Sequence, residues 1–235
     1  RALLILPRFE DYNTSALHRA TSHLPGKTSD GFRHSALAPP RRIPYSVSMH
    51  VELDLPGFVD LQVNGFVGVD FSGPDLTEES FRHACHTLLE RGTAAFLPTV
   101  ITSAPELTRR NLERMASVLK KDAMLARHIP GFHLEGPFIS REPGAVGAHD
   151  PAAVRPPDCA YFDRLCQWAG DRIRLLTIAA ETSGAEVLAR HAAARDIIVS
   201  CGHQLADAAT LARLVEAGAS ALTHLGNGCP NQVHR

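Results

Sequence analysis

Three residues that can bind a metal ion stand at the ends of short apolar runs in the second half of the chain. Glu135 ends one such run, and His203 and His224 each follow another. In a parallel sheet, a residue just past the end of a strand points into the mouth where the loops converge. Two imidazoles and a carboxylate placed there can hold a divalent cation and leave positions open for water. The pattern predicts the metal site of a hydrolase barrel.

Each of these residues also has a simpler interpretation. A lone histidine in an apolar setting is more often a hydrogen-bonded core residue than a ligand, and His203 and His224 gain weight only together with Glu135. The Glu135 carboxylate would be costly to bury unless a cation or a hydrogen-bond donor met it. Two nitrogens and one oxygen suit a zinc-like or iron-like divalent ion. His133, two residues before Glu135, is expected either to line the pocket or to pack beneath the metal.

The elements that must position these residues form a repeating pattern from residue 55 onward. The expected strands are Phe58–Val63, Ala94–Val100, Ile129–Leu134, Ile173–Ile178, Ile197–Cys201 and Ala219–Thr223. The expected helices are Glu78–Arg91, Leu107–Leu119 and Val187–Ala194, and the last two are preceded by the capping-box patterns Ser103-x-x-Glu106 and Ser183-x-x-Glu186. Such alternation predicts an α/β protein with a parallel sheet. The strands are continuously apolar, so helices should cover both faces, as in a (β/α) barrel or a doubly wound sheet.

The number of units predicts an incomplete barrel. A closed (β/α)8 barrel needs eight strand-helix units, and about six are expected here. Residues 1–54 are predicted to be an irregular N-terminal segment, or the remnant of a small β domain, and residues 55–235 a partial barrel. An open seam would leave strand edges unpaired, which predicts poor solubility or oligomerisation.

Composition excludes several classes of protein. The 235 residues are 44% hydrophobic with a net charge of −1, enough for one large domain and without the basic excess of a nucleic-acid or acidic-membrane partner. No apolar run approaches the length of a membrane span. The five cysteines are scattered without a C-x-x-C pair, which favours neither a disulfide framework nor a zinc knuckle and fits a cytoplasmic location.

Five motifs in sequence order carry a family resemblance. They are Leu55–Gly65, His133–Phe138, Gly147–His149, Gly202–His203 and Thr223–Pro230. Together they resemble the N-acetylglucosamine-6-phosphate deacetylase family of the amidohydrolase superfamily, from about Leu55 to Arg235. The resemblance implies a metal-dependent (β/α)8 barrel, usually a homodimer. It also implies removal of the acetyl group from N-acetylglucosamine 6-phosphate, giving glucosamine 6-phosphate and acetate.

The resemblance also implies roles for individual residues. Glu135, His203 and His224 would hold one divalent ion, zinc or iron. Gln62 and Asn64 lie on one face of a strand, where the wider superfamily has His-x-His, and are expected to contact the substrate beside that single metal. His149 would contact the sugar and polarise the acetamide carbonyl.

Further residues are expected to bind the sugar phosphate. The segment Gly226, Asn227 and Gly228 could offer backbone N–H groups to an anion. Arg235 could pair with the sugar phosphate. The resemblance implies that this phosphate is bound to the neighbouring subunit. Glu181, at the end of the fourth expected strand, is expected to be a supporting or structural residue.

The resemblance implies that the general base is an aspartate at the end of an eighth strand, which is expected to lie beyond Arg235. Asp60, within the first strand motif, and Asp207, at a helix start, are poor substitutes. The chain is therefore expected to be a C-terminally truncated form with an atypical N-terminus and impaired hydrolysis. Two alternatives stay open. One is an amidohydrolase acting on another N-acetyl sugar or a cyclic amide, and the other is a non-catalytic fragment that binds metal or sugar phosphate. An unrelated phosphate-binding barrel is disfavoured.

Overall fold

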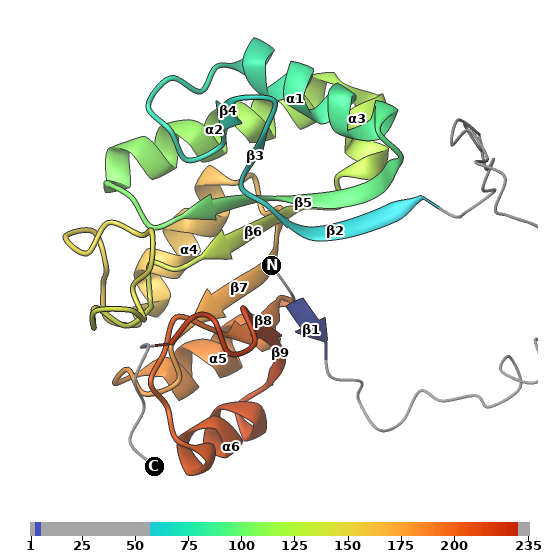
Figure 1. Ribbon diagram of the computed structural model, residues 1–235. Coiled ribbons are helices and arrows are strands. Elements are labelled where there is room, and N and C mark those ends of the chain that lie inside the picture. Colours follow the sequence, from blue (N-terminus) through green and yellow to red (C-terminus); the bar gives the residue numbers. More distant parts are fainter. Residues whose placement is uncertain (1–2, 6–56, 230–235) are drawn as a thin grey trace, which may run out of the picture. The chain divides into compact units, whose positions relative to one another are not determined.

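The computed structural model describes residues 3–5 and 57–229, with side chains from residue 57 onward (Figure 1). These residues belong to one compact unit. The predicted irregular segment 1–54 lies outside the described residues, except for the short strand β1 (Leu3–Ile5).

Six strands of the described residues form a curved parallel sheet. They are β2 (Phe58–Val63), β5 (Thr93–Ile101), β6 (Phe132–Glu135), β7 (Ile173–Ile178), β8 (Ile198–Cys201) and β9 (Ala219–Thr223). Each pairs in parallel with the next along the chain, in the order of a (β/α) barrel. β1 pairs antiparallel with β9 at one edge. The prediction of an incomplete barrel is confirmed.

Helices follow the strands and lie on the outer side of the curved sheet (Figure 1). They are α1 (Glu78–Glu90), α2 (Pro105–Lys121), α3 (Ala123–His128), α4 (Cys159–Trp168), α5 (Ala185–Ala193) and α6 (Ala208–Glu216). Two short strands, β3 (Gly65–Phe66) and β4 (Val69–Asp70), make a hairpin before α1. Among the described residues, no helix is long and apolar enough to cross a lipid bilayer.

Several predicted boundaries need correction. The expected strand Ile129–Leu134 begins only at Phe132, because α3 occupies the preceding residues and Ile129 caps its end. Both predicted capping boxes are wrong, since α2 and α5 have no side-chain cap. The N-cap of α5 is Gly184, which is in the left-handed region at φ 91°. A capping box does form at the start of α1, between Thr77 and Ser80.

The interior of the sheet carries a buried polar layer beneath its carboxyl end. His133 is fully buried, and its Nε2 lies 2.8 Å from Thr177 Oγ1. Thr223 Oγ1 lies 2.9 Å from Thr177 Oγ1 and 2.7 Å from Ser200 Oγ. Burial lowers the pKa of the His133 imidazole to about 4, so the ring is neutral near pH 7. His133 thus packs beneath the site, one of its two predicted positions.

Asp122 joins three helices and provides a test of the fold. Its side chain caps α3 by accepting a hydrogen bond from Leu125 N at 3.0 Å, and it lies near Arg82 and His86 of α1. The bond from Leu125, with the neighbouring His86 and Arg82, holds the pKa of Asp122 below its ordinary value. We expect Asp122→Ala to lower the free energy of unfolding by about 1 kcal/mol at neutral pH, measured by urea denaturation.

The pH dependence of this effect follows from the direction of the shift. A carboxyl with a lowered folded-state pKa contributes stability at neutral pH and loses it as the pH falls through that pKa. The difference between wild type and Asp122→Ala should therefore narrow in acid. Asp122→Asn keeps a capping side chain without the charge and should retain most of the stability. An equal loss in both variants would contradict the capping role.

Candidate metal centre

Glu135, His203 and His224 meet at the carboxyl end of the sheet. Glu135 is the last residue of β6, is 2% exposed, and pairs with Ile101 of β5 and Thr177 of β7. His203 follows β8, and His224 directly follows β9. Both histidines have left-handed backbones, with φ of 53° and 54°. Such conformations are uncommon for residues other than glycine and cluster at functional sites.

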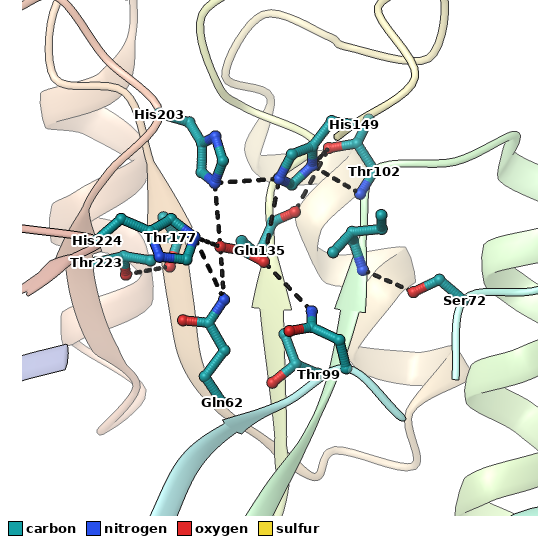
Figure 2. A network of polar contacts seen from close by, with 12 residues as sticks. Gln62, Ser72, Thr99, Thr102, Glu135, His149, Thr177, His203, Thr223 and His224 are labelled. Atoms are coloured by element: carbon teal, nitrogen blue, oxygen red, sulfur yellow. Dashed lines mark hydrogen bonds and ion pairs between the residues drawn. The ribbon is translucent and has the colours of Figure 1, made fainter. Parts of the chain in front are cut away.

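The two imidazoles converge on a single carboxylate oxygen (Figure 2). Glu135 Oε1 lies 3.0 Å from His203 Nε2 and 2.6 Å from His224 Nε2. Burial by itself would raise the pKa of the Glu135 carboxyl, but the hydrogen bonds with His203 and His224 hold that pKa well below its ordinary value. The carboxylate is therefore ionised, and the sequence-predicted trio is in mutual contact.

The hydrogen bonding of His203 defines which of its nitrogens carries a proton. Its Nδ1 lies 2.8 Å from the carbonyl oxygen of Ala145. A carbonyl oxygen only accepts, so Nδ1 carries the hydrogen, and in the neutral ring Nε2 has a lone pair. That lone pair faces the Glu135 carboxylate, which is unfavourable unless a proton or another cation lies between them.

His149 has the opposite arrangement. It is 5% exposed, lies in the loop between β6 and α4, and its Nδ1 accepts a hydrogen bond from Thr102 N at 3.1 Å. In the neutral ring the hydrogen is then on Nε2, which lies 3.2 Å from His203 Nε2 and 4.0 Å from Glu135 Oε2. Burial, assisted by the nearby His203, lowers the pKa of the His149 imidazole to about 4. His149 therefore presents a neutral N–H group to the cluster.

Distances alone also permit a second ligand set. Glu135, His149 and His203 offer ligand atoms that lie within 4.8 Å of one another. This set contains His149 in place of the predicted His224. The two sets share Glu135 and His203 and differ only in the third residue, and His149 Nε2 carries a hydrogen in the neutral ring because Nδ1 accepts from Thr102 N.

Two amide side chains, those of Gln62 and Asn64, also contact Glu135, and Gln62 approaches it from the side opposite His203 (Figure 2). Gln62 Nε2 donates to Glu135 Oε1 at 2.7 Å, and Asn64 Nδ2 donates to Glu135 Oε2 at 3.4 Å. Gln62 Nε2 also lies 3.5 Å from His224 Nε2. Gln62 Oε1 is buried and has no hydrogen-bond partner among the described residues. Both amide groups, predicted to contact substrate, contact the carboxylate.

The remaining predicted site residues are less directly placed. Asn227 N and Gly228 N donate to the His224 carbonyl oxygen at 2.6 and 3.2 Å, so they close a turn that also contains Gly226. Their role toward a sugar phosphate stays a prediction, and Arg235 lies outside the described residues. Glu181 accepts a hydrogen bond from Leu205 N at 2.8 Å, a structural contact.

Thr102 is a site residue that sequence reasoning missed. Its backbone N–H orients His149, and its Oγ1 lies 2.9 Å from His149 Nδ1 and 3.4 Å from the Glu135 carbonyl oxygen. Thr102 directly follows β5. The rule that selected the ligands, a polar residue just past a strand end, would have selected it too.

Comparison with known proteins identifies relatives by sequence. No family model matches the chain. It is 36% identical over 183 residues to the N-acetylglucosamine-6-phosphate deacetylase of Bos taurus, a match that covers 77% of this chain and 44% of the relative. It is 37% identical over 173 residues to an N-acetylgalactosamine-6-phosphate deacetylase of a Shewanella species, with 73% and 42% covered.

A solved structure agrees with these matches. A variant N-acetyl-D-glucosamine-6-phosphate deacetylase from Mycobacterium smegmatis, in complex with N-acetyl-D-glucosamine-6-phosphate, superposes with a TM-score of 0.66 at 30% identity and covers 75% of this chain. The chain spans less than half the length of these three proteins, from 42% to 44%.

Proposed function

We propose, on the premise that the chain belongs to the N-acetylglucosamine-6-phosphate deacetylase family, that its metal centre serves hydrolysis of the acetamide of N-acetylglucosamine 6-phosphate. The products would be glucosamine 6-phosphate and acetate. The observation that carries this proposal is the convergence of His203 Nε2 and His224 Nε2 on Glu135 Oε1, at 3.0 and 2.6 Å.

The proposed ligands of one divalent ion, zinc or iron, are Glu135, His203 and His224. The donor set fits such an ion, because an ionised carboxylate and the lone pair of His203 Nε2 face each other at 3.0 Å. His149 is the weaker ligand candidate. Its Nδ1 accepts a hydrogen bond from Thr102 N, so the ring hydrogen of neutral His149 is on Nε2. To bind a metal through Nε2, the ring would have to lose that hydrogen or move it to Nδ1, which would break the hydrogen bond with Thr102 N.

When bound, the cation would lower the pKa of a water molecule and steady negative charge on the acetamide oxygen. Glu135, His203 and His224 would orient it. His149 would donate its Nε2 hydrogen to the acetamide carbonyl, in the manner of an oxyanion-hole donor. Thr102 N, by occupying His149 Nδ1, keeps that hydrogen on the nitrogen that faces the cluster.

Proton transfer to the departing amine needs a further group. Among the described residues, Glu135 is the only carboxylate with a hydrogen bond or ion pair to the imidazoles of His149, His203 and His224. Asp60 accepts from Gln62 N, and Asp207 caps α6 through Thr210 N. We therefore propose that hydrolysis by this chain is slow.

Zinc binding and acetate release together test the proposal. The purified chain should bind one zinc ion and release acetate from N-acetylglucosamine 6-phosphate slowly, above the uncatalysed rate and only without chelator. Rapid turnover would show that a proton-transfer group was overlooked. Zinc binding without acetate release would leave only a non-catalytic role, and absence of both would overturn the proposal.

One observation favours a second substrate. A relative named N-acetylgalactosamine-6-phosphate deacetylase has a sequence identity to this chain of 37%, against 36% for the Bos taurus relative named for the glucosamine compound. The two substrates differ in the configuration of one hydroxyl group, while the acetamide chemistry is the same. Acetate release from both sugars, each with and without the 6-phosphate, would separate these substrates from an amidohydrolase that ignores the phosphate.

A further inference from the structure

We infer that Gln62 and Asn64 are positioning residues that hold the Glu135 carboxylate in place for the metal, and do not act by binding the substrate. We call these two side chains the amide clamp. The inference rests on the proposed metal centre, because the clamp acts through a proposed ligand. It gives these residues a role different from the one expected from the sequence.

The clamp reaches Glu135 across the concave side of the sheet. Gln62 lies in β2 and Asn64 directly follows it, so strand alternation places both on one face, while Val63 between them is buried in the core. In the sheet, β5 separates β2 from β6, which carries Glu135. The contacts therefore depend on the curvature of the sheet, which brings side chains of β2 over β5.

Each amide serves a different carboxylate oxygen. Gln62 Nε2 donates to Oε1 at 2.7 Å, and Asn64 Nδ2 lies 3.4 Å from Oε2. Hydrogen bonds to an ionised carboxylate are stronger than those between neutral groups. Held at both oxygens, the carboxylate keeps Oε1 toward His203 and His224. Amide nitrogens have no lone pair for a cation, so the clamp orients the ligand without being one.

The unpaired oxygen of Gln62 supports this assignment. Turning the amide over would place Oε1 against the Glu135 carboxylate, where two oxygens repel, so the observed orientation is the favourable one. In that orientation Gln62 Oε1 is buried without a partner among the described residues. An unsatisfied buried acceptor costs about 1–3 kcal/mol. The protein keeps Oε1 in this unfavourable position while Nε2 donates to Glu135. Because Oε1 is buried, substrate that approaches through solvent does not reach it.

Zinc affinity measured by chelator competition tests the clamp. Gln62→Met keeps the length of the side chain and removes its donor. We expect a loss of affinity of about 10–100-fold, as for other groups that orient metal ligands. Asn64→Ala should lower the zinc affinity less, because the hydrogen bond from Asn64 to Glu135 is longer than the one from Gln62. Gln167→Met makes the same chemical change on the exposed surface of α4 and should leave the affinity unchanged.

A double-mutant cycle separates positioning from a general structural role. If the clamp acts through the carboxylate, Gln62→Met should have little further effect on zinc affinity in a Glu135→Gln background. Circular dichroism checks folding, and Asn64→Ala carries the test if Gln62→Met does not fold. Wild-type affinity in the clamp variants would overturn this inference and leave the metal centre standing. A wild-type chain that binds no zinc would overturn both.

Discussion

Replacing Glu135 with glutamine should lower zinc affinity by more than about 100-fold. Loss of a residue that only orients a metal ligand lowers affinity by about 10–100-fold, and Glu135 is proposed as a ligand itself. Glutamine has the size of glutamate but no charge. Glu135 Oε1 is the atom at which His203, His224 and Gln62 all meet, at 3.0, 2.6 and 2.7 Å. The substitution thus removes the only negative charge among these contacts, and metal-dependent acetate release should disappear with it.

The measurement is zinc content after equilibrium dialysis, with the unfolding transition recorded in parallel. Glu113→Gln is the matched control, because Glu113 is an exposed residue of α2 with a side chain 51% accessible. It should retain zinc fully. Unchanged zinc content in Glu135→Gln would remove the basis for the whole site, since no other carboxylate of the described residues has a hydrogen bond or ion pair to the imidazoles of His149, His203 and His224.

The sheet and the meeting of the three ligands could be predicted because both follow from one rule. Parallel strands end at the same edge, so residues just past several strand ends must lie near one another. Glu135 is the last residue of its strand, and the strands before His203 and His224 end within a residue or two of them. Continuous apolar character was enough to find these strands.

Features that depend on contacts between distant segments could not be predicted. The capping boxes at Ser103 and Ser183 failed because a pattern of residue types does not determine backbone geometry, and α5 instead begins after a left-handed Gly184. The contact between Gln62 and Glu135 joins residues 73 positions apart and depends on sheet curvature. The family resemblance implied a place for Gln62 beside the metal, but nothing in the sequence indicated its contact with Glu135.

The role of His149 also depends on such a contact, and its substitution should have the second large effect. His149→Leu removes the Nε2–H group and puts an apolar side chain in its buried position. Loss of one donor to a developing oxyanion costs about 10²–10³-fold in turnover, so acetate release should fall by that factor. Zinc affinity should stay within a few-fold of wild type, because the ring proton set by Thr102 N makes His149 a donor.

Zinc affinity in His149→Leu distinguishes the two ligand sets. If Glu135, His149 and His203 bind the metal, as their mutual distances within 4.8 Å permit, the variant should lose zinc as severely as Glu135→Gln. If His224 is the third ligand, zinc is retained and only the chemical step is slowed.

The carbonyl ¹³C shift of bound, labelled substrate gives a readout independent of turnover, since it should move upfield without the donor. His83→Leu, on the exposed face of α1, should change none of these quantities. Retained zinc with an unchanged carbonyl shift would exclude His149 from both roles.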